Sequence, residues 1–321
     1  MCLVAIAIDQ SRRFPLVLAG NRDEYYERPA QRLGWWSPGD RAPDILGGRD
    51  LHAGGTWLGL TAHGRLALVT NVRDPSRHDA EAPSRGDIVP LWLRGELSMD
   101  RFWTRIALAG YNGFNVVAAD FARGECFWAG NTGALPVRLE RGLWGVSNAA
   151  LDTPWPKVHT LKARLREAVD LAPDADALAD RLFAALADRT PAPDDALPST
   201  GVPVEIERAL SPAFIRMPQR SYGTRCSTVI VAERVSKRLV THVFERTFTP
   251  GSPLALLRRV ALRDWPPRYL HTPEGWRAAQ EDVAESQVAA HHDGEPHADA
   301  TAPRRRQRTL LAPAAAPRRR T

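Results

Sequence analysis

The chain has 321 residues, of which 44% are hydrophobic, which is enough to bury one large core or two modest ones. Its three cysteines, at positions 2, 126 and 226, are too few and too scattered for a disulfide framework or a zinc knuckle. No run of 18 apolar residues predicts a membrane span, and the N-terminus lacks the pattern of a signal peptide. We therefore expect a reduced, cytoplasmic protein.

The formal charge of +6 comes from the C-terminal tail. Seven arginines and no acidic residue follow Pro303, so the remainder has 36 basic and 37 acidic side chains and is close to neutral. That balance argues against a specific nucleic-acid-binding fold. Residues 277–321 are rich in Ala, Pro and Arg with almost no aromatic residue, which predicts a disordered tail after one folded domain of residues 1–276. The arginine runs could contact anions, although a solvated tail is the simpler interpretation.

The first half of the chain shows strand patterns separated by turns. "LVAIAI" (3–8) and "PLVLAG" (15–20) predict an antiparallel hairpin, with "NRDEYYERPA" beginning where the second strand ends. "GGTWLGLTAHGRLALVTN" (54–71) predicts two strands around a turn at His63–Gly64. Residues 111–120 and 124–131 predict another pair, and 135–148 a hairpin around Arg141–Gly142.

Two helices and a final strand pair follow. Residues 155–171 and 174–190 place their apolar side chains at helical spacing. "CSTVIVAERVSKRLVTHVFERTF" (226–248) predicts two strands around a turn near Ser236. This order of strands, helices and strands indicates an α+β layered domain with mostly antiparallel sheets.

Cys2 precedes the first predicted strand directly. The initiator Met is usually removed when residue 2 is small, and Cys2 would then carry both a thiol and a free α-amine. An α-amine titrates near ~8, so it can take the proton of its own thiol as a neighbouring His does in other cysteine enzymes. A rigid strand would hold such a nucleophile in place. The alternative is that Cys2 is a small apolar residue at a strand end.

Several polar residues at strand ends could complete a site around Cys2. The predicted hairpin returns Arg22 and Asp23 beside the start of the chain, where Arg22 would favour the thiolate and Asp23 would orient the α-amine. Asn71 and Asn148 each close a predicted strand, and an Asn amide can donate to an oxyanion. Arg225 could bind a carboxylate or polarise a carbonyl. A surface salt bridge at 22–24 and turn-forming asparagines are the simpler interpretations.

Several segments together resemble the NRDE family, also called the transport and Golgi organization protein 2 family. The resemblance runs in order from Met1 to about Leu270. The segments that carry it are "MC", "LVLAGNRDEYYERPA", "GGTWLGLTAHGRLALVTN", "SRGDIV", "YNGFNVV", "GLWGVSNAALDTPWPKV" and "YGTRCSTVIV".

That family is similar in pattern to N-terminal nucleophile hydrolases of the penicillin V acylase and choloylglycine hydrolase type. The similarity implies a four-layer α-β-β-α sandwich of antiparallel sheets and cleavage of a non-peptide C–N bond in a small-molecule substrate. By the resemblance, Cys2 matches the nucleophile, and the other matching site residues are Arg22, Asp23, Asn71, Asn148 and Arg225.

The leading hypothesis is an amidohydrolase that acts on N-acyl amides through Cys2 and needs no cofactor. The alternative is a carrier of haem or an acyl conjugate on the same fold, with His52, His63, His78 or Cys2 as haem ligand. A structural role in membrane traffic is a third possibility. Loops 25–50, 74–87 and 190–222 are expected to line the pocket, and their Arg and Pro content hints at an anionic ligand. The sequence does not identify the substrate or the oligomeric state.

Overall fold

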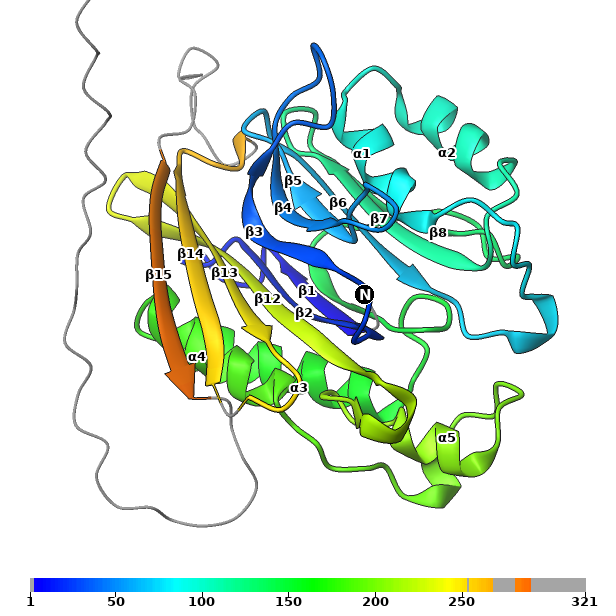
Figure 1. The fold of residues 1–321 in the computed structure, drawn as a ribbon. Helices are drawn as coiled ribbons and strands as arrows, with labels where there is room; N and C mark the ends of the chain where they lie inside the picture. Colours follow the sequence, from blue (N-terminus) through cyan, green and yellow to red (C-terminus); the bar gives the residue numbers. More distant parts are fainter. Residues whose placement is uncertain (1–2, 253, 268–280, 290–321) are drawn as a thin grey trace, which may run out of the picture. The chain divides into compact units, whose positions relative to one another are not determined.

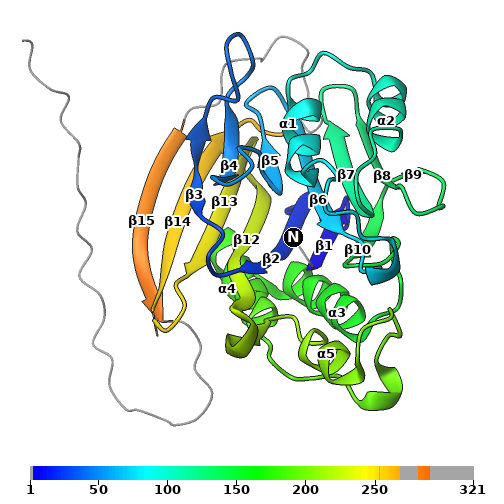
Figure 2. The same cartoon turned by 45° about the vertical axis from the view of Figure 1, so that its right-hand side comes forward.

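The computed structural model describes residues 3–252 and 254–267, together with the backbone of residues 281–289. All of these residues fall in one compact unit that spans Met1–His291. Two antiparallel β-sheets pack face to face, and helices cover their outer faces (Figure 1). The two sheets and their helices are seen from a second side in Figure 2.

The larger sheet has eight strands and contains both ends of the described chain. Its order is β10-β1-β2-β12-β13-β14-β15, and β11 pairs with β12. The bounds are β1 Leu3–Ile8, β2 Leu16–Tyr25, β10 Gly142–Val146, β11 Arg216–Met217, β12 Tyr222–Val235, β13 Arg238–Phe248, β14 Leu254–Arg263 and β15 Glu281–Ala289.

The smaller sheet has seven strands in the order of the sequence, because each strand pairs with the next one along the chain. The bounds are β3 Ala30–Trp36, β4 Ile45–Asp50, β5 Leu58–Leu60, β6 Arg65–Asn71, β7 Phe114–Asp120, β8 Glu125–Gly130 and β9 Val137–Arg138.

The helices follow from local start signals and apolar spacing. Pro156 opens α3 at a position where its missing N–H costs nothing, and the Asp174 side chain accepts from the Ala177 N–H at 2.8 Å to cap α4. The bounds are α1 Ile88–Leu93, α2 Met99–Ala107, α3 Pro156–Leu171, α4 Ala175–Leu186 and α5 Val204–Ala209. Short 3-10 helices span Pro75–Arg77, Arg85–Asp87, Asp194–Ala196 and Pro218–Arg220.

The alternation of side chains along each strand separates the layers. Val4, Ile6 and Ile8 of β1 join the core between the sheets, whereas the intervening residues of β1 pack against α3 and α4. In the smaller sheet, Leu66 and Leu68 join the same inter-sheet core, and the other face packs against α1 and α2. The fold is therefore α+β with four layers, α-β-β-α, as expected from the sequence.

Most predicted elements are confirmed. β1, the β5–β6 pair around His63–Gly64, the β7–β8 pair, helices α3 and α4, and the β12–β13 pair lie where their patterns predicted them. The apolar faces predicted for α3 and α4 are buried.

Three local predictions are wrong. β2 does not end at residue 20 but continues to Tyr25, because β12 supplies backbone partners as far as Tyr222 opposite Tyr25. The predicted hairpin 135–148 does not form, since β9 pairs with β8 while β10 pairs with β1 in the other sheet. Residues 25–50, predicted as a loop, contain β3 and β4. A register shift between Gln31 and Gly34 interrupts the regular pairing of these two strands.

The structure also includes part of the predicted tail in the sheet. Residues 281–289 form β15, which pairs antiparallel with β14 from Leu254 opposite Ala289 to Leu262 opposite Glu281. The remainder of the predicted tail, 277–280 and 290–321, lies outside the described residues.

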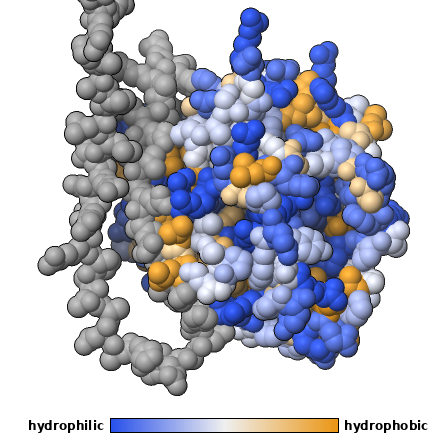
Figure 3. Space-filling model, viewed as in Figure 1, coloured by the Kyte–Doolittle hydropathy of each residue, from blue (hydrophilic) through white to orange (hydrophobic). Residues whose placement is uncertain are grey.

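The surface seen in Figure 3 is mostly hydrophilic, with hydrophobic residues in small separate groups. None of the helices in the described part of the chain is long and apolar enough to cross a bilayer.

Candidate active site

The "NRDE" motif (residues 21–24) lies inside β2, between β1 and β12. Because successive side chains of a strand point to opposite faces, neighbouring residues of the motif face different layers. Asn21 Nδ2 donates to the Leu186 carbonyl at 2.9 Å on the helix side. Arg22 faces the smaller sheet, where its guanidinium stacks on the Trp57 ring at 4.3 Å.

Arg22 is buried, and the structure describes partners for only part of its guanidinium. Its exposed fraction is 3%. Nη2 lies 3.7 Å from a carboxylate oxygen of Asp50 and 3.9 Å from one of Glu24. Among the residues that the structure describes, Nη1 has no hydrogen-bond partner. A buried donor without a partner costs free energy unless a ligand or water satisfies it, so Nη1 is available to a bound molecule.

Asp50 is the centre of the charge cluster around Arg22. Its carboxylate accepts from Arg28 Nε at 2.7 Å and from the backbone N–H groups of His52 at 2.9 Å and Ala53 at 3.3 Å. Burial acts to raise the pKa of Asp50, but the hydrogen bonds from Arg28 and from these N–H groups outweigh burial and hold the pKa below its usual value. Asp50 is therefore an anion that fixes the positions of two arginines.

Asp23 lies on the opposite face of β2 from Arg22. The Thr224 hydroxyl donates to Asp23 Oδ1 at 2.6 Å and accepts from the Ile215 N–H at 2.9 Å. Arg22 and Asp23 thus lie on the two faces of β2.

The two asparagines are in direct contact. Asn71 ends β6, Asn148 lies two residues beyond β10, and Asn148 Nδ2 donates to the Asn71 carbonyl at 2.9 Å. Asn71 lines both chambers of the cleft described below. Asn148 therefore positions Asn71 across the gap between the two sheets.

Arg225 holds a turn together next to the motif. It occupies a bulge of β12, and its Nη1 donates to the carbonyls of Tyr25, Tyr26 and Arg28 at 2.8, 2.9 and 3.2 Å. Burial lowers the pKa of Arg225, and the positive charge of Arg22 lowers it further. The guanidinium orients the chain just after the motif.

A cleft with two chambers lies beside these residues. The larger chamber, of about 620 Å³, is partly apolar, and the smaller one, of about 420 Å³, is mainly polar. They share Asn71, His78 and Arg85, so they adjoin. The apolar wall of the larger chamber includes Tyr25, Ile206, Leu210, Ile215, Met217 and Tyr222. The charged side chains of the smaller chamber are Arg22, Glu24, Arg28, Asp50, Asp79 and Arg85.

The sequence-predicted residues divide into three groups. Arg22 and Asn71 line the smaller chamber, and Asn71 and Asn148 line the larger one. Asp23 and Arg225 are not among the residues that line either chamber. Asp23 accepts from Thr224, and Arg225 donates to the Tyr26 carbonyl. Cys2 lies outside the described residues. Of the expected loops, 74–87 and 190–222 line the cleft, whereas 25–50 contributes only Tyr25, Arg28 and Asp50.

Sequence reasoning missed Asp50 and Trp57, which hold Arg22. Their segments, "LGGRD" and "GGTWLG", have the ordinary composition of strand ends and turns, so no signal in the sequence distinguished them.

The remaining titratable candidates have different surroundings. His52 and His78 line the smaller chamber, whereas His63 belongs to the β5–β6 turn and lines neither chamber. Cys126 and Cys226 are free and buried, and burial raises the pKa of the Cys226 thiol well above its usual value. No group of three or more His, Cys, Asp or Glu side chains in the described part of the chain could hold a metal ion.

Comparison with known proteins identifies relatives over most of the chain. Residues 1–250 match the model of the family described as Transport and Golgi organisation 2. A Transport and Golgi organization protein 2 homolog from Bos taurus is 34% identical over 253 residues, which cover 73% of this chain and 89% of the relative. The Homo sapiens homolog is 32% identical over 254 residues, with the same coverage.

Solved structures show only distant similarity. A Caenorhabditis elegans N-acylethanolamine-hydrolyzing acid amidase ortholog is 11% identical, with a TM-score of 0.40 over 72% of this chain and 92% of that one. A conjugated bile acid hydrolase from Clostridium perfringens, in its C2A mutant form, is 9% identical, with a TM-score of 0.39 over 90% of this chain and 98% of that one. Scores this low support no conclusion about activity.

Proposed function

The chain belongs to the Transport and Golgi organisation 2 family, and within it we propose that this protein is an amidohydrolase that cleaves N-acyl amides with Cys2 as nucleophile. A free thiol requires a reducing compartment, so we place the reaction in the cytoplasm.

The observation that carries the proposal is the register of β1 on β2. Leu3, the first described residue, pairs with Asn21. The proposal continues this antiparallel pairing by one residue, which sets Cys2 opposite Arg22. Directly opposed residues of an antiparallel pair share one face of the sheet, so the thiol would face the smaller chamber beside Arg22.

The chemistry then follows from the groups around that position. After removal of Met1, the α-amine of Cys2 takes the thiol proton, and the thiolate attacks the acyl carbon to form a C–S bond. The carbonyl π-electrons move to oxygen, where the free Arg22 Nη1 and the Asn71 amide supply donors. The C–N bond breaks as the ammonium returns its proton to the leaving amine. Water, deprotonated by the same α-amine, then adds to the thioester carbon. The C–S bond breaks, the acid leaves, and the ammonium returns its proton to the Cys2 thiolate.

In this proposal the other residues hold the reacting groups in position. Asn148 orients Asn71, and Asp50 with Trp57 orients Arg22. Asp23 orients the α-amine from the helix side of β2. Arg225 fixes the turn that follows the motif.

Intact-mass analysis and acyl release from a panel of N-acyl amides test the proposal. We expect mature protein that begins at Cys2 and forms an acyl adduct on that residue. Cys2→Ala should abolish turnover and Cys2→Ser should reduce it strongly, because a hydroxyl is a weaker acid than a thiol. Cys126→Ala and Cys226→Ala are the controls, since both thiols are buried. Retained Met1 in active protein, or full turnover by Cys2→Ala, contradicts the mechanism.

A second candidate function is a carrier of haem or an acyl conjugate on the same fold. The presence of His52 and His78 in the smaller chamber favours it, because neutral imidazole is a common axial ligand of haem iron. Haem titration of His52→Ala, His78→Ala and Cys2→Ala separates the two functions. Haem affinity that falls in these variants, without hydrolysis by the wild type, would establish the carrier.

A further inference from the structure

Another cavity, of about 350 Å³, has a lining that is almost entirely different from that of the cleft. Its walls come from the end of β3, from β4 with the loop that follows it, from α1 and from α2 with the turn after it. It shares Ala53 alone with the smaller chamber of the cleft and no residue with the larger chamber. We call this cavity the arginine groove.

The arginine groove carries an excess of positive charge. Arg49, Arg94 and Arg105 line it, and Asp87 is the one acidic residue among its lining residues. None of the three guanidinium groups has an ion pair within the described residues, and Arg49 Nε donates only to the Gly54 carbonyl at 3.2 Å. Guanidinium groups without carboxylate partners are suited to bind carboxylate or phosphate groups.

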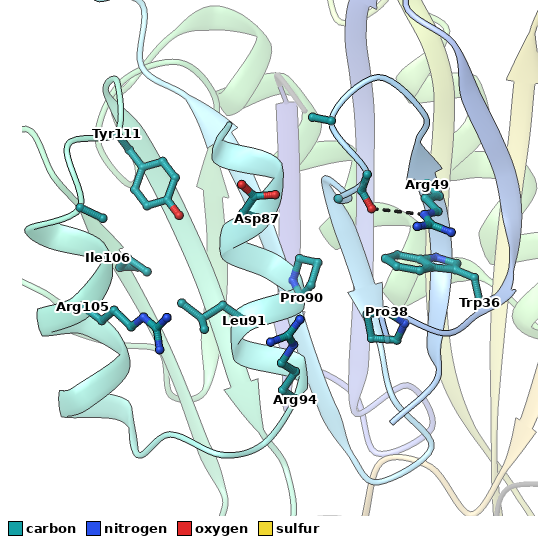
Figure 4. Close-up of a pocket in the computed structure, with 14 residues that line it drawn as sticks. Trp36, Pro38, Arg49, Asp87, Pro90, Leu91, Arg94, Arg105, Ile106 and Tyr111 are labelled. Atoms are coloured by element: carbon teal, nitrogen blue, oxygen red, sulfur yellow. Dashed lines mark hydrogen bonds between the residues drawn. The ribbon is translucent and has the colours of Figure 1, made fainter. Parts of the chain in front are cut away.

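The groove also offers a flat stacking surface. The Arg49 guanidinium lies over the Trp36 ring at 4.8 Å. Figure 4 shows Trp36, Pro38 and Arg49 on one side of α1, and Arg105 and Tyr111 on the other, with Leu91 of α1 and Arg94, the residue after α1, between them. A flat ring can pack on such an arrangement of aromatic and guanidinium planes.

We propose that the arginine groove binds a small anion that carries a flat aromatic ring, such as a nucleoside monophosphate or an aromatic carboxylate. Arg94 and Arg105 bind the anionic group, and Trp36 with Arg49 packs against the ring. Asp87 accepts a hydrogen bond from an N–H or O–H group of the ligand. A volume of about 350 Å³ is at the lower end of the range for small-molecule sites, which fits a ligand of this size.

Isothermal titration of the full-length protein at physiological salt tests the site, with AMP, benzoate and inorganic phosphate as probes. We expect AMP or benzoate to bind with a stoichiometry of one and at least tenfold more tightly than inorganic phosphate. The double variant Arg94→Gln/Arg105→Gln should weaken that binding at least tenfold, and so should Trp36→Leu. Both arginines are exposed, so their replacement leaves the core intact.

The matched control is the double variant Arg101→Gln/Arg123→Gln. Both residues are exposed and neither lines the groove, so the control removes the same charge from a different part of the surface. Its affinity should stay within twofold of the wild type. The proposal is wrong if neither AMP nor benzoate binds, if inorganic phosphate binds as tightly as both, or if the control loses as much affinity as the groove variant.

Discussion

Asp50→Asn tests the charge cluster that orients Arg22. The amide oxygen of Asn can still accept from the N–H groups of His52 and Ala53, so the variant removes mainly the charge and the hydrogen bond from Arg28. That bond is 2.7 Å long, and the Asp50 side chain is only 10% exposed. A charge-assisted hydrogen bond contributes about 1.5–3 kcal/mol, and the loss of one partner of a buried pair costs more.

We therefore expect Asp50→Asn to lower the free energy of unfolding by about 2–3 kcal/mol. Urea denaturation followed by circular dichroism measures this change. Asp44→Asn is the control, because Asp44 is exposed and has no ion pair within the described ranges, and it should change stability by less than about 0.5 kcal/mol. A value for Asp50→Asn within that same limit would refute the view that Asp50 holds the two arginines.

The direction of the pKa shift of Asp50 sets how the difference in free energy of unfolding between wild type and Asp50→Asn changes with pH. The pKa of Asp50 is lower in the folded protein than in the unfolded chain, so folding favours its ionised form. The stabilisation is fully present above the ordinary carboxyl pKa, near ~4, and is lost as the pH falls through the folded value. The difference in free energy of unfolding between the two proteins should be constant around neutral pH and should disappear in acid.

Two further predictions concern Arg225 and the C-terminal strand. Arg225→Met should lower stability by about 2–3 kcal/mol in urea denaturation, because three turn carbonyls lose their donor, and Arg225→Lys should retain part of this stability. Full stability of Arg225→Met together with lost substrate binding would instead assign Arg225 to the substrate. A chain ended after His291 should keep its melting temperature, whereas one ended after Trp276 loses β15, exposes the edge of β14 and should melt several degrees lower. Equal melting temperatures would show that β15 adds no stability.

The elements that the sequence predicts well are those whose patterns are local. Helix α3 has its apolar residues at helical spacing and a proline at its first turn, so the pattern alone locates it. The course of the chain between residues 135 and 148 is different, because its two strands, β9 and β10, pair in different sheets. Leu139 is buried in the inter-sheet core, which carries the chain from one sheet to the other, and no local pattern contains that information.

The candidate site shows the same division. The motif "NRDE" and the two strand-terminal asparagines are visible in the sequence, and the structure brings Arg22, Asn71 and Asn148 to one cleft. The residues of the motif alternate between the two faces of the sheet only because β2 extends through them. That length depends on pairing with β12, which lies more than 190 positions further along the chain. Asp50 and Trp57 reach Arg22 only through the packing of one sheet on the other.

The smaller chamber of the cleft and the arginine groove differ in their balance of charges, and this difference suits them to different ligands. The smaller chamber of the cleft has three arginines and three carboxylates among its lining residues, so its charges compensate one another. Arg22 Nη1, which has no hydrogen-bond partner among the described residues, and the Asn71 amide therefore face a site without an excess of charge, and such a site favours a neutral carbonyl group over an anion. The arginine groove has three arginines and one carboxylate, so it favours an anion over a neutral group. The arginine content of the cleft loops alone suggested an anionic ligand there, but those loops also carry Asp50 and Asp79, and Glu24 of β2 adds a third carboxylate from outside them.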